Sequence, residues 1–153
     1  MAGWSSTIPD TMAALLSLWQ ATFPGTDVLV VDGPPTGGDG QTKMACVGYD
    51  GQDGAVHAET APAGYGDSNQ ESYTVFCAVI AVDGGTEWGP VRDQAFSLYT
   101  DCVEAIGQDQ TLGGTVLRAM PGSIAVNQSS SPSGLRVVIA FGVQVSAFTK
   151  EAD

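Results

Sequence analysis

One short stretch of the sequence, His57-Ala58-Glu59, carries residue types that often do chemistry. It matches the His-x-Glu half of the zinc deaminase signature, in which the histidine binds zinc and the glutamate transfers protons. The other half of that signature, Pro-Cys-x-x-Cys, is absent, and the chain contains 1 histidine. Because a zinc site needs several such ligands, we predict that His57 lies in an exposed loop and is neither catalytic nor bound to a metal.

Two carboxylates stand close by, in the stretch Asp50-Gly51-Gln52-Asp53-Gly54. The stretch lacks the carboxylate spacing and the closing glutamate of an EF-hand. The sequence therefore allows only a weak contact with a divalent ion at this stretch. The chain has no Gly-x-Ser-x-Gly motif, and no pair of carboxylates stands out as a general acid and base. We therefore expect a protein that is not an enzyme and that uses no metal or other cofactor.

The glycine pair Gly113-Gly114 suggests either a phosphate-binding loop or a turn between two packed elements. A phosphate-binding loop follows a strand and opens a helix, so that the helix N-terminus meets the anion. Here a helical pattern precedes the glycines and a strand pattern follows them, and no lysine completes a Walker motif. The order of elements therefore predicts a turn.

Composition and charge narrow the class of protein. The 153 residues are 43% hydrophobic and 14% charged, which predicts one folded domain over residues 1–153. The net charge of −12 disfavours tight binding to nucleic acid or to anionic membranes, although such a surface suits DNA that must slide past it. The N-terminal residues lack the pattern of an export signal and no apolar run reaches the length of a membrane span, so we expect a cytoplasmic protein. In that compartment Cys46, Cys77 and Cys102 are predicted to be buried free thiols.

The apolar periodicity predicts two helices and five strands. Helical spacing covers residues 8–23, where the apolar stripe includes Leu15, Leu16 and Trp19, and residues 91–106, with Gly107 as the stop. Strand patterns cover residues 28–31, 44–49, 73–82, 115–126 and 135–148, and loops are expected at about 32–43, 50–72 and 127–134. The predicted fold class is α+β: a small mixed or antiparallel sheet packed by two helices, in the order α-β-β-β-α-β-β.

Three consecutive stretches carry a family resemblance: "YTVFCAVIAVDGG", "VRDQAFSLYTDCVEAI" and "DQTLGGTVLRAM". The chain resembles the tail terminator, or tail completion, proteins of long-tailed bacteriophages, in which a T-L-G-G-like turn links the second helix to the closing strands. The matching residues of the turn are Asp109, Thr111, Leu112, Gly113, Gly114 and Val116. Arg92 lies near the start of the helix, where the family often carries an arginine.

The resemblance implies a structural virion protein of the tail or neck, assembled in the host cytoplasm. In the family, six copies form a ring that ends the tail tube and accepts the head connector or stopper protein, and genomic DNA passes through the lumen without specific binding. Candidate interface residues are Asp39, Asp50, Asp53, His57, Glu59 and Arg92. Two other classes stay open: a head-closure or stopper protein of the same neck, and a small-ligand-binding domain.

Overall fold

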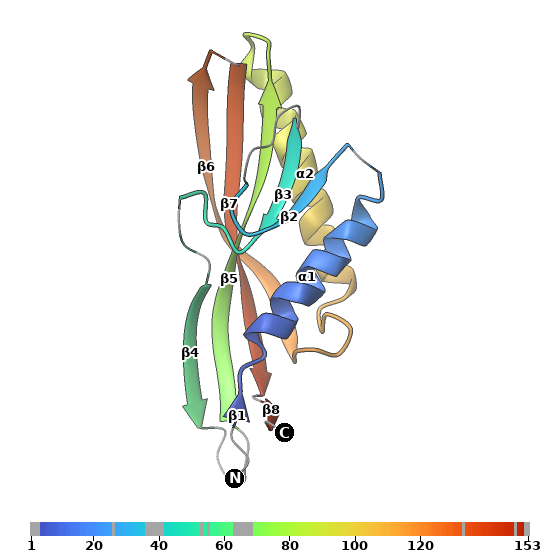
Figure 1. Cartoon of the computed structure of the whole chain (residues 1–153), viewed down its shortest axis with the longest axis vertical. Coiled ribbons are helices and arrows are strands. Elements are labelled where there is room, and N and C mark those ends of the chain that lie inside the picture. Colours follow the sequence, from blue (N-terminus) through green and yellow to red (C-terminus); the bar gives the residue numbers. More distant parts are fainter. Residues whose placement is uncertain are drawn as a thin grey trace.

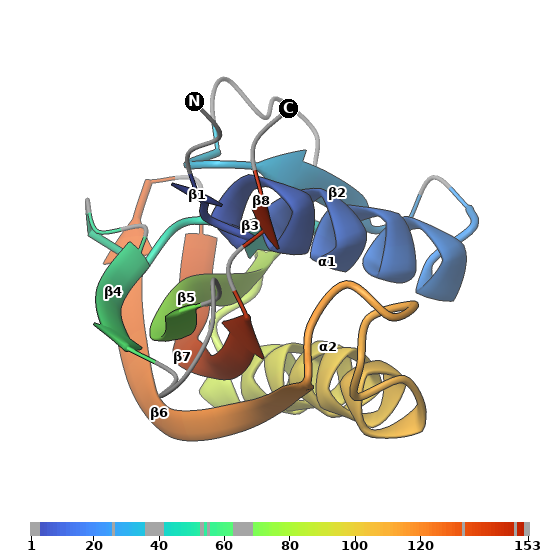
Figure 2. The same ribbon diagram turned by 90° about the horizontal axis from the view of Figure 1, so that it is seen from below.

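A six-stranded sheet forms the centre of the fold, and both helices pack on one of its faces (Figures 1 and 2). The computed structural model describes residues 4–25, 27–35, 42–52, 54, 56–62, 69–132, 134–148 and 150–151. The elements are β1 (Trp4–Ser5), α1 (Ile8–Thr22), β2 (Leu29–Asp32), β3 (Lys43–Val47), β4 (Val56–Pro62), β5 (Asn69–Asp83), α2 (Trp88–Gln108), β6 (Arg118–Ser131), β7 (Gly134–Phe148) and β8 (Lys150–Glu151).

The two longest strands, β5 and β7, pair antiparallel along the length of the molecule (Figure 1). The strand order is β2-β3-β5-β7-β6, and β3 and β4 share the remaining edge of β5: β3 pairs with its C-terminal half and β4 with its N-terminal half. The β2–β3 pair is parallel, and the short strands β1 and β8 form a separate antiparallel pair. The predicted α+β class, with two helices on a mixed sheet, is confirmed.

Helix α1 buries Leu15 and Trp19 of the predicted stripe, and Leu16 is half-buried against the same core. Leu15 and Trp19 have no exposed surface, and the Trp19 ring lies 5.9 Å from that of Phe141 on β7. The indole Nε1 donates a hydrogen bond of 3.3 Å to the carbonyl oxygen of Cys102 on α2. Trp19 therefore joins both helices to the sheet.

Helix α2 also follows its apolar spacing, and its buried residues are Val91, Ala95, Leu98, Cys102 and Ile106. The predicted stop at Gly107 is wrong by a short margin, because the helix continues to Gln108 and Asp109 is its C-cap. Gly107 lies on an exposed side of the last turn, where a glycine costs some stability but does not end the helix.

The C-terminal half of β5 is covered on both faces. Tyr73, Val75, Cys77, Val79 and Ala81 belong to the core beneath the helices. On the other face Ala78 and Ile80 belong to a second cluster with Met44, Cys46, Tyr49 and Val138. The segment that follows β3 packs on this second face, where a Cβ on Gly51 would lie 3.6 Å from Val138.

Two predicted loops are strands in part. Residues 50–72 contain β4 and the start of β5, which pair over seven positions, and residues 127–131 extend β6 to Ser131. Residues 127–131 and the start of β5 are polar, and β4 mixes polar residues with small apolar ones. Backbone hydrogen bonds can hold such strands without a continuous apolar face. Of the predicted loop at 32–43, Asp32 ends β2 and Lys43 begins β3, while residues 36–41 lie outside the described part of the chain.

The three cysteines are free and buried, as predicted. Burial raises the pKa of the Cys46 thiol from 9.0 to about 11, although the nearby Arg136 lowers it somewhat. Burial also raises the pKa of Cys77 and of Cys102. Because a thiolate is the reactive form of cysteine, these thiols are poor nucleophiles in the folded chain.

We therefore expect slow thiol labelling of the native protein at pH 8, and reaction of all three cysteines once denaturant is added. Stability should also decline as the pH rises above about 9, because the unfolded chain then loses thiol protons that the folded chain retains. Labelling followed by mass spectrometry, and urea unfolding at pH 7 and pH 10, measure the two effects. Rapid native labelling, or equal stability at both pH values, would contradict the burial of the thiols.

Candidate functional site

The segment between α2 and β6 carries the glycine pair and forms a tight turn. Leu112, Gly113 and Gly114 have φ angles of 50°, 71° and 88°, so three consecutive residues adopt the left-handed conformation. Glycine adopts that conformation without strain, and a Cβ at either glycine would meet open space. The glycines are therefore required by the backbone path and not by close packing.

The backbone N–H groups of the turn are used within it. Asp109 Oδ1 accepts a hydrogen bond of 3.0 Å from the Gly113 N–H, and the Thr111 carbonyl accepts one of 3.1 Å from the Gly114 N–H. An anion-binding loop presents such groups outward to its ligand. With these donors occupied and a strand following, the structure agrees with the predicted turn and not with a phosphate-binding loop.

Two apolar side chains fix the turn to the core. Leu112 and Val116 are 4% and 6% exposed and belong to the cluster beneath the helices. The Ala119 N–H donates a hydrogen bond of 2.7 Å to the Gln110 carbonyl, so the turn also folds over the beginning of β6. The six residues predicted from the family pattern, from Asp109 to Val116, thus form one unit that sets the direction in which β6 leaves α2.

Two of the other candidate interface residues lie on opposite sides of the sheet. Arg92 is exposed on α2, on the helical side of the sheet, whereas Asp50 follows β3 and lines a hollow with Val138 and Ala140 on the opposite side. The Asp50 Oδ1 accepts a hydrogen bond of 2.8 Å from the Gln52 N–H. Asp39 and Asp53 lie outside the described residues.

His57 and Glu59 lie on β4, so the predicted exposed loop is wrong at these positions. Their backbones pair with Thr74 and Ser72 of β5. Extended backbone is favoured here because β5 continues beyond β3 and leaves an unpaired edge that β4 completes. In the described part of the chain no group of three or more His, Cys, Asp or Glu side chains is placed to hold a metal ion.

A buried polar network joins the start of α1 to β5, and sequence reasoning missed it. Glu71 is 3% exposed, and its Oε1 accepts hydrogen bonds of 2.6 Å from both the N–H and the hydroxyl of Thr7. Its Oε2 accepts a hydrogen bond of 2.9 Å from Ser6. The carboxylate thus lies at the N-terminus of α1, where the helix dipole favours negative charge.

The network continues through Tyr73. A hydroxyl has one hydrogen, and that of Thr7 is given to Glu71, so Tyr73 donates to Thr7 across 2.8 Å and accepts from Thr11 across 2.5 Å. Burial raises the pKa of Tyr73, the hydrogen bond that Thr11 donates lowers it, and the Glu71 carboxylate raises it. Thr7, Thr11, Glu71 and Tyr73 are buried, and Ser6 is exposed at the edge of the network. The network therefore positions the start of α1 against β5.

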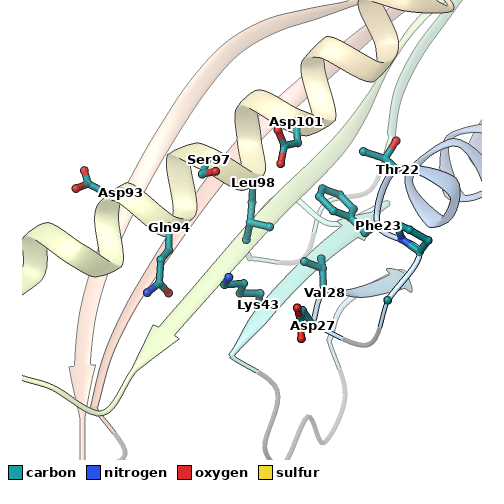
Figure 3. Close-up of a pocket in the computed structure, with 12 residues that line it drawn as sticks. Thr22, Phe23, Asp27, Val28, Lys43, Asp93, Gln94, Ser97, Leu98 and Asp101 are labelled. Carbon is teal, nitrogen blue, oxygen red and sulfur yellow. The ribbon is translucent and has the colours of Figure 1, made fainter.

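A cleft of about 480 Å³ lies between the C-terminal end of α1, β3 and α2 (Figure 3). In Figure 3 Phe23, Val28 and Leu98 form its apolar part, and Lys43 stands across from α2. Its acidic residues are Asp27, Asp93 and Asp101. An apolar wall beside three carboxylates suits the cleft to an apolar or cationic group.

Comparison with known proteins does not identify a family. No protein-family model matches the sequence, and no curated protein matches it. A solved structure titled "Virion of native gene transfer agent (GTA) particle" contains a chain that is 13% identical, with a TM-score of 0.47 over 89% of this chain and 94% of that chain. No helix among the described residues is long and apolar enough to cross a membrane.

Proposed function

We propose that this protein is a structural virion protein that forms a ring at the end of a phage tail tube and joins the tube to the head connector. The ring consists of six copies, and its partners are the tail tube protein on one side and the connector or stopper protein on the other. The protein acts through its surfaces, without an enzymatic activity or a cofactor.

The observation that carries the proposal is the segment from Tyr73 to Val126, whose sequence resembles the tail terminators. It folds as β5, α2, the turn and the first part of β6. The turn residues are used as a structural corner, with Leu112 and Val116 in the core and the glycines in left-handed conformation. A corner of this kind supports a building block of an assembly better than a ligand-binding loop.

The charge of the chain supports the same role. A ring of subunits that each carry −12 presents a negative lumen to DNA, and like charges limit adhesion of the DNA to the wall. DNA passage then needs no specific contact. The charge argument applies to any neck protein through which the genome passes. The measurement of tail length must therefore distinguish a tail terminator from the other neck proteins.

Tail length tests the proposal directly. Deletion of the gene should give overlong tubes without attached heads, because nothing ends tube growth, and supply of the wild-type chain in trans should restore joined particles of normal length. Electron microscopy measures both features. Tails of normal length that stay separate from heads would instead indicate the head-closure or stopper protein, and normal particles would contradict a structural role in the neck.

Shortening the chain within the predicted loop at residues 50–72 would remove β4 from the sheet, so it would disturb the fold as well as any ring contact. A substitution at an exposed position keeps the fold and is the better probe of ring contacts. The mass of the purified protein distinguishes the ring from the remaining alternative, a ligand-binding domain. A stable multimer supports the ring, and a monomer that binds a small molecule in the cleft supports the ligand-binding domain.

A further inference from the structure

β6 is an edge strand of the sheet, and the outer edge of its C-terminal half is unpaired among the described residues. We propose that its C-terminal part, Ile124–Ser131, pairs head to tail with the β4 edge of a second copy of this chain. The inference rests on the ring proposed above and names the contact that holds neighbouring subunits together.

The hydrogen-bond register identifies which backbone groups face outward. In an antiparallel strand pair, every second pair of opposed residues exchanges backbone hydrogen bonds. The residues between them direct their N–H and C=O groups away from the partner strand. The Ala119 N–H bonds the Gln110 carbonyl, outside the sheet, so Ala119 and its partner Val145 form a pair that points away. The same holds for every second residue of β7 counted back from Val145, and its partner on β6 directs its backbone groups outward. After the bulge these outward residues of β6 are Ile124, Val126, Gln128 and Ser130.

The two halves of this edge differ. In the first half the turn occupies the Ala119 N–H, Pro121 has no N–H, and the register shifts between Pro121 and Ile124. Proline and bulges are the devices by which proteins prevent strand addition at an edge. The second half has neither, and no backbone hydrogen bond within the described part of the chain reaches its outward groups.

Exposed apolar side chains accompany the open half. Ile124 and Val126 are 42% and 44% exposed and lie on the face of the sheet that carries the helices, opposite Phe141 and Ile139. The Phe141 ring is buried and lies 5.1 Å from Tyr99 on α2, so Ile124 stands at the border of the core beneath the helices. An added strand would cover these side chains as well as satisfy the backbone.

Charge favours a second copy as the occupant. β6 contains none of the 17 acidic residues of the chain, and its charged residue is Arg118 at the beginning. Two copies that each carry −12 repel each other wherever carboxylates meet. The Ile124–Ser131 stretch carries no charge, so two copies can approach there without opposing carboxylates.

The opposite side of the sheet provides the partner edge. β4 pairs with β5 and with no other described strand, whereas β6 pairs with β7, so the free edges of β4 and β6 face in opposite directions. Pairing of two different edges is head to tail and closes into a ring when the rotation permits. The seven residues of β4 give a strand of about 23 Å, which Ile124–Ser131 matches in length.

The test compares the mass of the purified full-length chain with that of variants. Val126→Lys places a charge on the open edge and should convert a wild-type multimer into a monomer with unchanged thermal unfolding. Phe148→Lys changes a side chain of similar exposure, 47%, at the end of β7, and should keep the wild-type mass. Gln128→Pro removes one outward N–H without adding charge and should also give a folded monomer.

Mixing variants tests the head-to-tail geometry. Thr60→Lys alters β4, and on its own it should be monomeric, whereas an equal mixture with Val126→Lys should form a dimer through the one intact pair of edges. A Thr60→Lys variant of wild-type mass would overturn the pairing with β4. A Val126→Lys variant of wild-type mass, or a wild-type chain that is monomeric at all concentrations, would overturn the β6 contact. The tail-length measurement is independent of these masses, so failure of the contact is distinguishable from failure of the proposed function.

Discussion

Replacement of Trp19 by alanine is expected to lower the free energy of unfolding by about 3–5 kcal/mol. The side chain has no exposed surface and contacts Phe141 of the sheet, while its indole N–H bonds α2. Alanine leaves a cavity where α1, α2 and the sheet meet. Because other contacts hold these elements in place, the cavity cannot close fully. Urea unfolding monitored by circular dichroism gives the change.

The control for this substitution is Gln20→Ala, on the next residue of α1. Gln20 is exposed, so its replacement should change the stability by less than about 0.5 kcal/mol. If Trp19→Ala left stability unchanged but prevented assembly, Trp19 would belong to a partner-binding face and the interpretation of α1 as a core helix would be wrong.

The elements that sequence patterns predicted well are those with many buried apolar side chains. α1, α2, β5 and β7 each bury a stripe or a face, and the period of that pattern is a direct consequence of burial. In β7, which the strand pattern over residues 135–148 predicts, the alternate residues Val137, Ile139, Phe141, Val143 and Val145 all lie in the core beneath the helices. For these elements the apolar pattern within the segment is therefore enough to predict which side chains are buried.

The strands that were missed lie at edges. The end of β6, Asn127–Ser131, consists of polar residues, and β4 is Val56 followed by small and polar residues and a proline. Both strands are held through backbone hydrogen bonds and show no clear apolar alternation. Their existence depends on β5 and β7 being long enough to offer an edge, which is a property of other parts of the chain. A pattern read within the strand itself therefore cannot reveal them.

The candidate site was predictable in part for the same reason. The turn from Asp109 to Val116 was found because its glycines and its order of elements are local features. Glu71 was not found, because it lay in a stretch that was interpreted as a loop, and its partner Thr7 is 64 residues away in sequence. Extension of β5 back to Asn69 would have placed Glu71 and Tyr73 on one face of the strand, which is the signal that could have revealed the network.

Replacement of Glu71 by alanine is expected to lower the free energy of unfolding by about 2–4 kcal/mol, since burial of unsatisfied donors costs about 1–3 kcal/mol for each group. The substitution removes the acceptor of the Thr7 N–H and hydroxyl and of the Ser6 hydroxyl. Thr7 is the N-cap residue of α1 but makes no side-chain cap of its own, so the start of the helix depends on this carboxylate. Hydrogen exchange should therefore show the first turn of α1 opening more often than the rest of the helix.

Glu71→Gln separates the hydrogen bonds from the charge. Glutamine keeps an Oε1 that can accept from both groups of Thr7, and its amide can donate to Ser6, whose hydroxyl is free to turn and accept. It loses the negative charge at the N-terminus of α1, an interaction worth about 0.3–2 kcal/mol. We therefore expect Glu71→Gln to lose less than half of what Glu71→Ala loses in urea unfolding. Equal losses in the two variants would mean that the charge, and not the set of hydrogen bonds, holds α1 against β5.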